Sequence, residues 1–272
     1  MREWSDEELE RYSRHIILED VGIEGQEKII NGKVLVIGAG GLGSPIAFYL
    51  AAAGVGEIGI VDGDVVDISN LQRQIIHFSS DVGIPKVESA KQKMTAINPH
   101  VKVNTYHTMI SADNVLDIIK PYDFVIDGTD NFATKFLIND ACILADKPYS
   151  HGGILRFSGQ TMTIKPRVSA CYACVFNAPP PAGVVPTCST AGILGAVAGM
   201  LGAIQAAEAL KFITGVGTPL YNTLLSFEAK NMAFRSVKFA KNPKCRVCGG
   251  SGITHLQDYE QAVCEVKHDK NS

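Results

Sequence analysis

A glycine-rich loop between an apolar run and a helix-forming stretch most constrains the fold of this chain. The loop reads GAGGLG over residues 38–43, directly after KVLVI and directly before SPIAFYLAAAG. Gly38, Gly40 and Gly43 fit a G-x-G-x-x-G spacing, in which glycines permit a tight turn and amide hydrogens at a helix N-terminus face phosphate. The sequence therefore predicts a strand, a phosphate-binding loop and a helix, which together begin a nucleotide-binding α/β fold.

A carboxylate follows where a ribose-binding residue is expected. The next strand-like run, EIGIV, ends directly before Asp62, which lies 19 residues beyond Gly43. An acid at this place is typical of dinucleotide-binding domains. The loop and Asp62 alone therefore leave open a nicotinamide-dependent oxidoreductase, and the rest of the chain decides which nucleotide is bound.

Helical and strand-like patterns alternate through the first half of the chain. The patterns predict helices over 5–17, 44–54, 86–97, 111–120 and 131–147, and strands over 33–37, 57–61, 101–106 and 123–127. Such alternation favours a Rossmann-like parallel sheet with helices on both faces. From about residue 150 onward, strand-like alternation with turn residues predicts antiparallel strands, which end in a hairpin of 220–229 with 232–240.

Composition excludes several classes of function. The 272 residues carry 25 lysines and arginines against 28 aspartates and glutamates, a net charge of −3 without a basic stripe for nucleic acid. The acidic start MREWSDEELE is unlike a signal peptide, and the apolar run 191–204 has 14 residues against the roughly 20 that a bilayer requires. We expect a cytoplasmic protein with no nucleic-acid or membrane partner, in which 191–204 is a buried helix.

Two C-x-x-C pairs form the strongest metal-binding pattern. Cys171 and Cys174 make the first pair, and Cys245 and Cys248 make the second, with 70 residues between the pairs. Two thiolate pairs suit the tetrahedral four-sulfur coordination of a structural zinc, which leaves no open position for catalysis. Redox dithiols or incidental cysteines are the alternatives, and a disulfide framework fits poorly with a chain that shows no export signal.

Charged residues beyond the loop favour a triphosphate over a dinucleotide. Arg73 lies in DISNLQRQ, Lys86 in IPKVES, and Asp130 three residues past DFVID, at the carboxyl edge where open α/β sheets bind ligands. Two cations and a metal-binding carboxylate suit ATP, whereas a nicotinamide dinucleotide carries only two phosphoryl charges. Taken singly, each has a plain alternative, which is a solvated surface charge for Arg73 and Lys86 and a helix N-cap for Asp130.

Together these stretches resemble the ubiquitin-activating-enzyme-like adenylyltransferases, in particular the bacterial MoeB/ThiF/HesA branch. The matching stretches are RYSRHI (11–16), GAGGLGS (38–44), VDGDVVDISNLQRQ (61–74), PKVESA (85–90), DGTDN (127–131), TCSTAG (187–192) and both C-x-x-C pairs. The resemblance implies an enzyme that uses ATP to adenylate the C-terminal glycine carboxylate of a small ubiquitin-fold sulfur-carrier protein ending in Gly-Gly. Pyrophosphate is released, and the activated carrier serves sulfur transfer in molybdopterin, thiamin or cysteine biosynthesis.

The resemblance also implies roles for individual residues. ATP would be held by Gly38, Gly40, Gly41, Gly43, Asp62, Ser69, Asn70, Leu71, Gln72, Arg73, Lys86, Asp130 and Asn131. Arg73 and Lys86 would neutralise phosphoryl oxygens, and Asp130 would hold magnesium on the leaving pyrophosphate. Arg14 would reach the nucleotide site of a partner subunit, so the implied working unit is a homodimer.

Cys188 has two interpretations. Some members of the family use a cysteine at this position for a covalent step after adenylation, and others carry it without needing it. A helix expected to start near Thr190 favours a lowered thiol pKa at Cys188. A small buried cysteine at a helix start is, however, also an ordinary packing choice.

We expect one adenylating domain over residues 1–248. It would comprise an N-terminal helical arm (1–32), an ATP-binding half (33–150) and a carrier-binding half with the zinc site (151–248). Residues 249–272 lose periodicity and are expected to form a mobile tail. Relatives that deliver sulfur themselves often carry a C-terminal rhodanese domain, but fewer than 25 residues follow Cys248, so we expect a separate protein to donate the sulfur.

Overall fold

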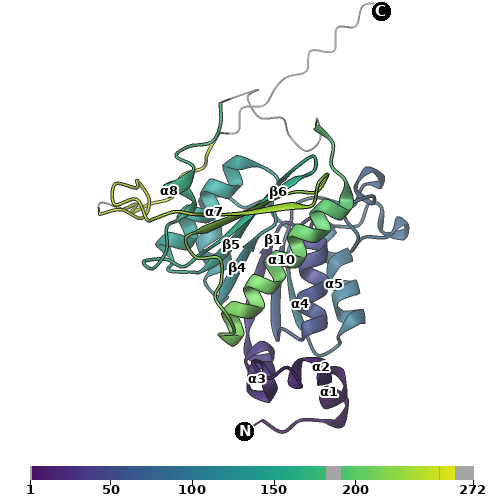
Figure 1. Ribbon diagram of the computed structural model, residues 1–272. Coiled ribbons are helices and arrows are strands. Elements are labelled where there is room, and N and C mark those ends of the chain that lie inside the picture. Colours follow the sequence, from purple (N-terminus) through teal and green to yellow (C-terminus); the bar gives the residue numbers. More distant parts are fainter. Residues whose placement is uncertain (1, 182–190, 251, 261–272) are drawn as a thin grey trace, which may run out of the picture.

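A computed structural model of the protein centres on one mixed β-sheet (Figure 1). The structure describes residues 2–181, 191–250 and 252–260. Within these residues, eight strands lie in the spatial order β3-β2-β1-β4-β5-β6-β7-β8. Their bounds are β1 Lys33–Ile37, β2 Glu57–Val61, β3 Lys102–Tyr106, β4 Phe124–Asp127, β5 Tyr149–Leu155, β6 Ser158–Ile164, β7 Thr223–Glu228 and β8 Ala233–Lys238.

The pairing of the strands changes from parallel to antiparallel at β5. Strands β3, β2, β1, β4 and β5 pair in parallel, whereas β5 to β8 pair antiparallel as two hairpins joined side by side. The predicted fold class is therefore confirmed: a Rossmann-like parallel half continues into antiparallel strands. Parallel strands end at one edge of the sheet, and this edge is where the functional residues gather.

Helices cover both faces of the sheet. Their bounds are α1 Asp6–Arg11, α2 Ser13–Ile16, α3 Gly22–Asn31, α4 Gly43–Ala53, α5 Lys86–Ile97, α6 Val115–Ile119, α7 Phe132–Leu144, α8 Tyr172–Val175 and α10 Gly195–Thr214. Successive side chains of a strand point to opposite faces. In β1, Val34 and Val36 accordingly join the apolar core beneath α4, α5 and α10, while Leu35 and Ile37 join the core beneath α6 and α7.

The predicted single helix over residues 5–17 is wrong in one respect, since the structure divides it into α1 and α2. The capping box of Ser5 with Glu8 starts α1 as expected. The helix ends at Tyr12, whose side chain is 3 % exposed and lies directly against Gly54. The Tyr12 hydroxyl accepts a hydrogen bond from Nδ2 of Asn98 at 2.8 Å. This distant contact, rather than local sequence, sets the break.

Ten residues of the apolar run predicted as a buried helix, 195–204, form the first half of α10, which begins at Gly195 and continues to Thr214. By length and composition alone this helix could cross a membrane. It instead packs against α4, β5 and β6, so closely that a Cβ on Gly202 would lie 2.4 Å from Cγ of Pro45. Its polar residues Gln205 and Glu208 are buried and hydrogen-bonded within the fold.

The segment after the second cysteine pair runs along the outside of the α7 face. Within residues 252–260, Ile253, Leu256 and Tyr259 pack against the core of that face. The Tyr259 hydroxyl donates a hydrogen bond to Asp140. The first part of the expected tail thus lies against the fold, while residues 261–272 lie outside the described residues.

Candidate functional site

The glycine loop between β1 and α4 has the tight geometry that its sequence predicts. Gly38 has a φ of +97°, and a Cβ there would lie 2.8 Å from the carbonyl oxygen of Gly128. A Cβ on Gly43 would lie 1.8 Å from the carbonyl oxygen of Gly38. Side chains at these two positions would therefore break the turn, which brings backbone amides to the carboxyl edge of the sheet.

A cavity of about 150 Å³ opens over this loop at the carboxyl ends of β1, β2 and β4, and we call it the loop cavity. Predicted site residues form much of its lining: Gly38, Gly40, Gly41, Asp62, Arg73, Lys86, Asp130 and Asn131. These residues come from five separate parts of the chain. The structure therefore brings together most of the residues that the sequence assigned to one nucleotide.

Lys86 lies at the first position of α5 and is only 6 % exposed. Its ammonium is 2.8 Å from Oδ2 of Asp64 and 4.0 Å from Oδ1 of Asp62. The Asp62 carboxylate in turn accepts a hydrogen bond from the amide of Ala39, in the glycine loop, at 2.8 Å. The plain alternative of a solvated surface charge is thus wrong for Lys86, since two carboxylates hold this cation in the loop cavity.

Arg73 approaches the loop cavity from the segment after β2. Its Nη1 donates to the carbonyl oxygen of Ser69 at 2.9 Å, and its Cγ lies beside Gly41. The other predicted residues of this segment do not line the cavity: Ser69, Asn70, Leu71 and Gln72. Ser69 and Asn70 instead hydrogen-bond with Asp67 and build the short helical turn that carries Arg73.

Asp130 lies between β4 and α7 and is exposed to both cavities of the site. The N-cap of α7 is the neighbouring residue, Asn131, whose side chain accepts from the amide of Thr134 at 2.8 Å. The plain alternative, a helix N-cap at Asp130, is therefore wrong. Asp130 is an exposed carboxylate at the carboxyl edge, the position expected for a metal ligand.

A second, larger cavity of about 910 Å³ lies over the antiparallel part of the sheet, and we call it the sheet cavity. Its lining includes Thr129, Asp130, Lys135, Phe136, His151, Gly153, Ile154, Gln160, Tyr172, Phe176, Phe227, Phe234 and Arg235. Three residues, Thr129, Asp130 and Ile154, line both cavities. The two cavities therefore adjoin at the carboxyl edge of β4.

A buried polar cluster beneath this junction was not predicted from the sequence. Asp127, the last residue of β4, is 1 % exposed and pairs with Lys135 at 3.0 Å and with Nδ1 of His151 at 3.0 Å. It also accepts hydrogen bonds from the amide and hydroxyl of Thr129. Burial alone would raise the pKa of Asp127, but Lys135 and the hydrogen bonds from His151 and Thr129 lower it to about 2.

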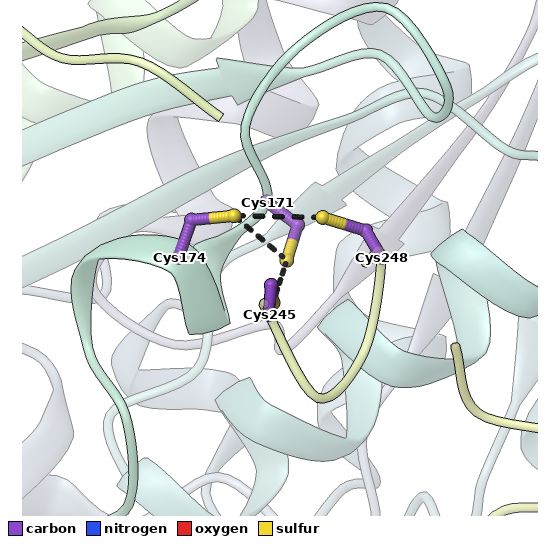
Figure 2. A group of neighbouring side chains, drawn as sticks. All are labelled: Cys171, Cys174, Cys245 and Cys248. Carbon is purple, nitrogen blue, oxygen red and sulfur yellow. Dashed lines mark hydrogen bonds between the residues drawn. The ribbon is translucent and has the colours of Figure 1, made fainter. Parts of the chain in front are cut away.

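The four predicted metal ligands meet at the end of α8 (Figure 2). All four sulfur atoms lie within 4.8 Å of one another, with 3.6 Å between Cys171 and Cys245 and 3.4 Å between Cys174 and Cys248. A tetrahedral site with metal–sulfur bonds of about 2.3 Å has sulfur–sulfur edges of about 3.8 Å. The cluster therefore has the size of a four-thiolate metal site, and the thiols are free rather than joined as disulfides.

The roles predicted for Arg14 and Cys188 are not tested by these sites. Arg14 is exposed on α2 and lines neither cavity. Cys188 lies outside the described residues, as does the helix start expected near Thr190. The role of each stays a prediction.

Comparison with known proteins agrees with this geometry. A sulfur carrier protein adenylyltransferase of Thermus thermophilus is 44 % identical over 97 % of this chain and 99 % of its own length. A probable adenylyltransferase/sulfurtransferase MoeZ of Mycobacterium tuberculosis is 47 % identical over 97 % of this chain and 67 % of its own length.

Solved structures of MccB from E. coli share the fold. One superposes with a TM-score of 0.81 at 24 % identity and covers 94 % of this chain and 77 % of MccB. Another, described as MccB with ATP, has a TM-score of 0.78 at 25 % identity and covers 88 % of this chain and 74 % of MccB. The profile of the ThiF family matches residues 12–247, and this chain therefore belongs to the ThiF family.

Proposed function

We propose that this chain is an adenylyltransferase that activates the C-terminal carboxylate of a small sulfur-carrier protein with ATP. The observation that carries the proposal is the loop cavity, where the glycine loop, a buried lysine and an exposed aspartate converge. The 44 % identity to a sulfur carrier protein adenylyltransferase, over nearly the full length of both chains, supports the same activity. A nicotinamide-dependent oxidoreductase, the alternative left by the glycine loop alone, has no such support.

Several groups around the loop cavity would contact the triphosphate of ATP. Amides of the glycine loop at the start of α4 would face phosphate oxygens, and Arg73 and Lys86 would offset the triphosphate charge. Asp130 would hold magnesium, which suits carboxylate oxygen ligands, on the leaving pyrophosphate. A solved structure of E. coli MccB with ATP, which shares this fold, supports ATP as the nucleotide.

The carrier's C-terminal tail fits the sheet cavity, which adjoins the loop cavity at Thr129 and Asp130. A tail in this cavity would bring its terminal carboxylate to the α-phosphate of ATP. One carboxylate oxygen attacks the α-phosphorus, the bond to the bridging oxygen breaks, and that electron pair leaves with pyrophosphate. The carboxylate is already ionised at neutral pH, so positioning and charge compensation, rather than a general base, would supply the rate.

The remaining assignments extend this proposal. The four-cysteine cluster would hold zinc as a structural ion, since all four ligand positions are filled by thiolates. Arg14 would act in the site of a partner subunit in a homodimer. A separate protein of the same cytoplasmic compartment would then donate sulfur to the activated carrier.

Exchange of labelled pyrophosphate into ATP tests the reaction. Purified protein with a Gly-Gly-ending carrier should catalyse exchange, and Lys86→Ala should reduce the rate roughly 30- to 1000-fold because a charged phosphate contact is lost. Lys91→Ala, an exposed lysine on the same helix, is the matched control and should keep the wild-type rate. Equal rates for Lys86→Ala and the control would refute the assigned role.

A further inference from the structure

One buried side chain in the sheet cavity has a polar atom that the described residues leave without a partner. Nδ1 of His151 lies 3.0 Å from Oδ2 of Asp127, while Nε2, on the other side of the ring, is buried and has no hydrogen-bond partner in the described part of the chain. His151 itself is 1 % exposed. A buried polar atom without a partner is costly, so a ligand group that pairs with it would bind favourably.

The surroundings of His151 fix its protonation. Lys135 directs its ammonium to Asp127, to the carbonyl oxygen of Thr129 at 2.7 Å and to that of Gly152 at 2.5 Å. The ionised Asp127 therefore needs a donor from His151, and Nδ1–H supplies it. Burial and the nearby Lys135 charge lower the pKa of His151 despite that hydrogen bond, so the ring is neutral at pH 7. The remaining nitrogen, Nε2, is consequently a hydrogen-bond acceptor.

The space beside Nε2 is open because residue 153 is glycine. A Cβ on Gly153 would lie 3.6 Å from Nε2 of His151 and 3.7 Å from the side chain of Gln160. All three residues line the sheet cavity. On the ring face, Tyr172 packs with its centroid 4.5 Å from that of His151 and fixes the imidazole in place.

The group that pairs with Nε2 has to be a donor that enters the sheet cavity. A terminal carboxylate and the phosphates of ATP carry no donor at neutral pH, and His151 does not line the loop cavity, where the sugar and base would bind. A peptide tail brings main-chain amides. A glycine in that tail has no side chain to keep its N–H away from the floor of the cavity.

We propose that Nε2 of His151 accepts a hydrogen bond from the amide of the carrier's C-terminal glycine and so positions the terminal carboxylate. The inference rests on the proposed function and adds a specific contact to it. Lys135 and Asp127 set the tautomer of His151, and Gly153 leaves the approach to Nε2 open.

Removal of a single donor atom from the carrier tests this contact. A carrier that supports exchange is prepared by ligation with either the native last peptide bond or an ester in its place, so that the amide N–H is absent. With the wild-type enzyme, the ester should lower kcat/KM for exchange about tenfold, since a buried acceptor loses its donor. With His151→Phe, amide and ester carriers should react at the same reduced rate.

Gly153→Ala provides a second variant that keeps His151 and its bond to Asp127. The added methyl group fits at ordinary contact distance and covers Nε2, so the difference between amide and ester carriers should disappear here too. Gly199→Ala is the control, because the added Cβ would meet no atom within 4 Å beyond the neighbouring backbone of its own helix, and this variant should retain the tenfold difference.

An equal ester effect in wild type, His151→Phe and Gly153→Ala would overturn the proposal, as would a wild type indifferent to the ester. Absence of exchange with the native carrier would instead refute adenylation itself and the contact with it. If a variant lost activity only because its folding is damaged, its exchange rates with the amide and the ester carrier would fall by the same factor. The ratio of the two rates would then stay at the wild-type value.

Discussion

Replacement of Asp127 by asparagine should lower the free energy of unfolding more than the same replacement at an exposed aspartate. The carboxylate is 1 % exposed and faces an ammonium, Lys135, that is 5 % exposed. The introduced amide would keep the shape and would still accept from Thr129, but Lys135 would remain as a buried charge without its counter-ion. Breaking a buried pair in this way costs about 3–5 kcal/mol, which is a large part of the stability of an ordinary domain.

A second variant separates this charge effect from lost packing. In Asp127→Asn combined with Lys135→Met, both charges are absent and the methionine keeps most of the apolar stem of the lysine. We expect the double variant to lose about 1–3 kcal/mol less stability than Asp127→Asn alone, because neither charge is then left unpaired. The exposed Asp117→Asn on α6 is the control and should change stability by less than about 0.5 kcal/mol.

The assay is urea unfolding at pH 7, followed by circular dichroism and tryptophan fluorescence, with zinc present throughout. The free energy of unfolding is compared among wild type, the single variants and the double variant at equal slope. A loss below about 1 kcal/mol for Asp127→Asn would refute the view that Lys135 depends on Asp127 for its charge balance. The same view would be refuted if the double variant were less stable than Asp127→Asn by the full cost of Lys135→Met measured alone.

Three further predictions concern the pH dependence of the Asp127 contribution, the glycine loop and the four-cysteine cluster. The low pKa of the Asp127 carboxyl stabilises the folded protein fully above the unfolded pKa of 3.8, and this stabilisation is lost as the pH falls toward about 2. The difference in the free energy of unfolding between wild type and Asp127→Asn should therefore shrink from pH 5 to pH 2, as measured by urea titration. Gly43→Ala should abolish nucleotide binding in calorimetry, because its Cβ would lie 1.8 Å from the carbonyl oxygen of Gly38; normal affinity for ATP would contradict the loop geometry. Cys248→Ser should lower the zinc content and the melting temperature while the remaining folded protein still binds ATP, and unchanged zinc by elemental analysis would refute the four-thiolate site.

Local patterns predicted the part of the fold that local forces determine. The strand, the glycine loop and α4 follow one another as expected, and α5 spans the predicted 86–97, because Asn98-Pro99 ends it in the sequence itself. The break at Tyr12 was missed, since it depends on contacts with Asn98 and Gly54 far along the chain.

In the candidate site, too, local motifs were predicted and contacts between distant segments were not. Residues within matching motifs, such as Lys86 and Asp130, line one cavity, while their roles in it stay predictions. The pairing of Asp127 with Lys135 and His151 was not predicted, because it depends on the register of β4 against β5 and on the docking of α7. An aspartate that ends an apolar strand-like run, followed by a lysine eight residues later, is the sequence signal that could have indicated the pair of Asp127 with Lys135.

The four cysteines also impose an order on synthesis of the chain. The first pair emerges from the ribosome before α10, β7 and β8, and the second pair emerges only after all three. A nascent chain that stops before Cys245 would therefore hold only two thiolates and could not close the metal site. The metal site would then form late in folding, when the second cysteine pair joins the helix α8, which was synthesised some 70 residues earlier.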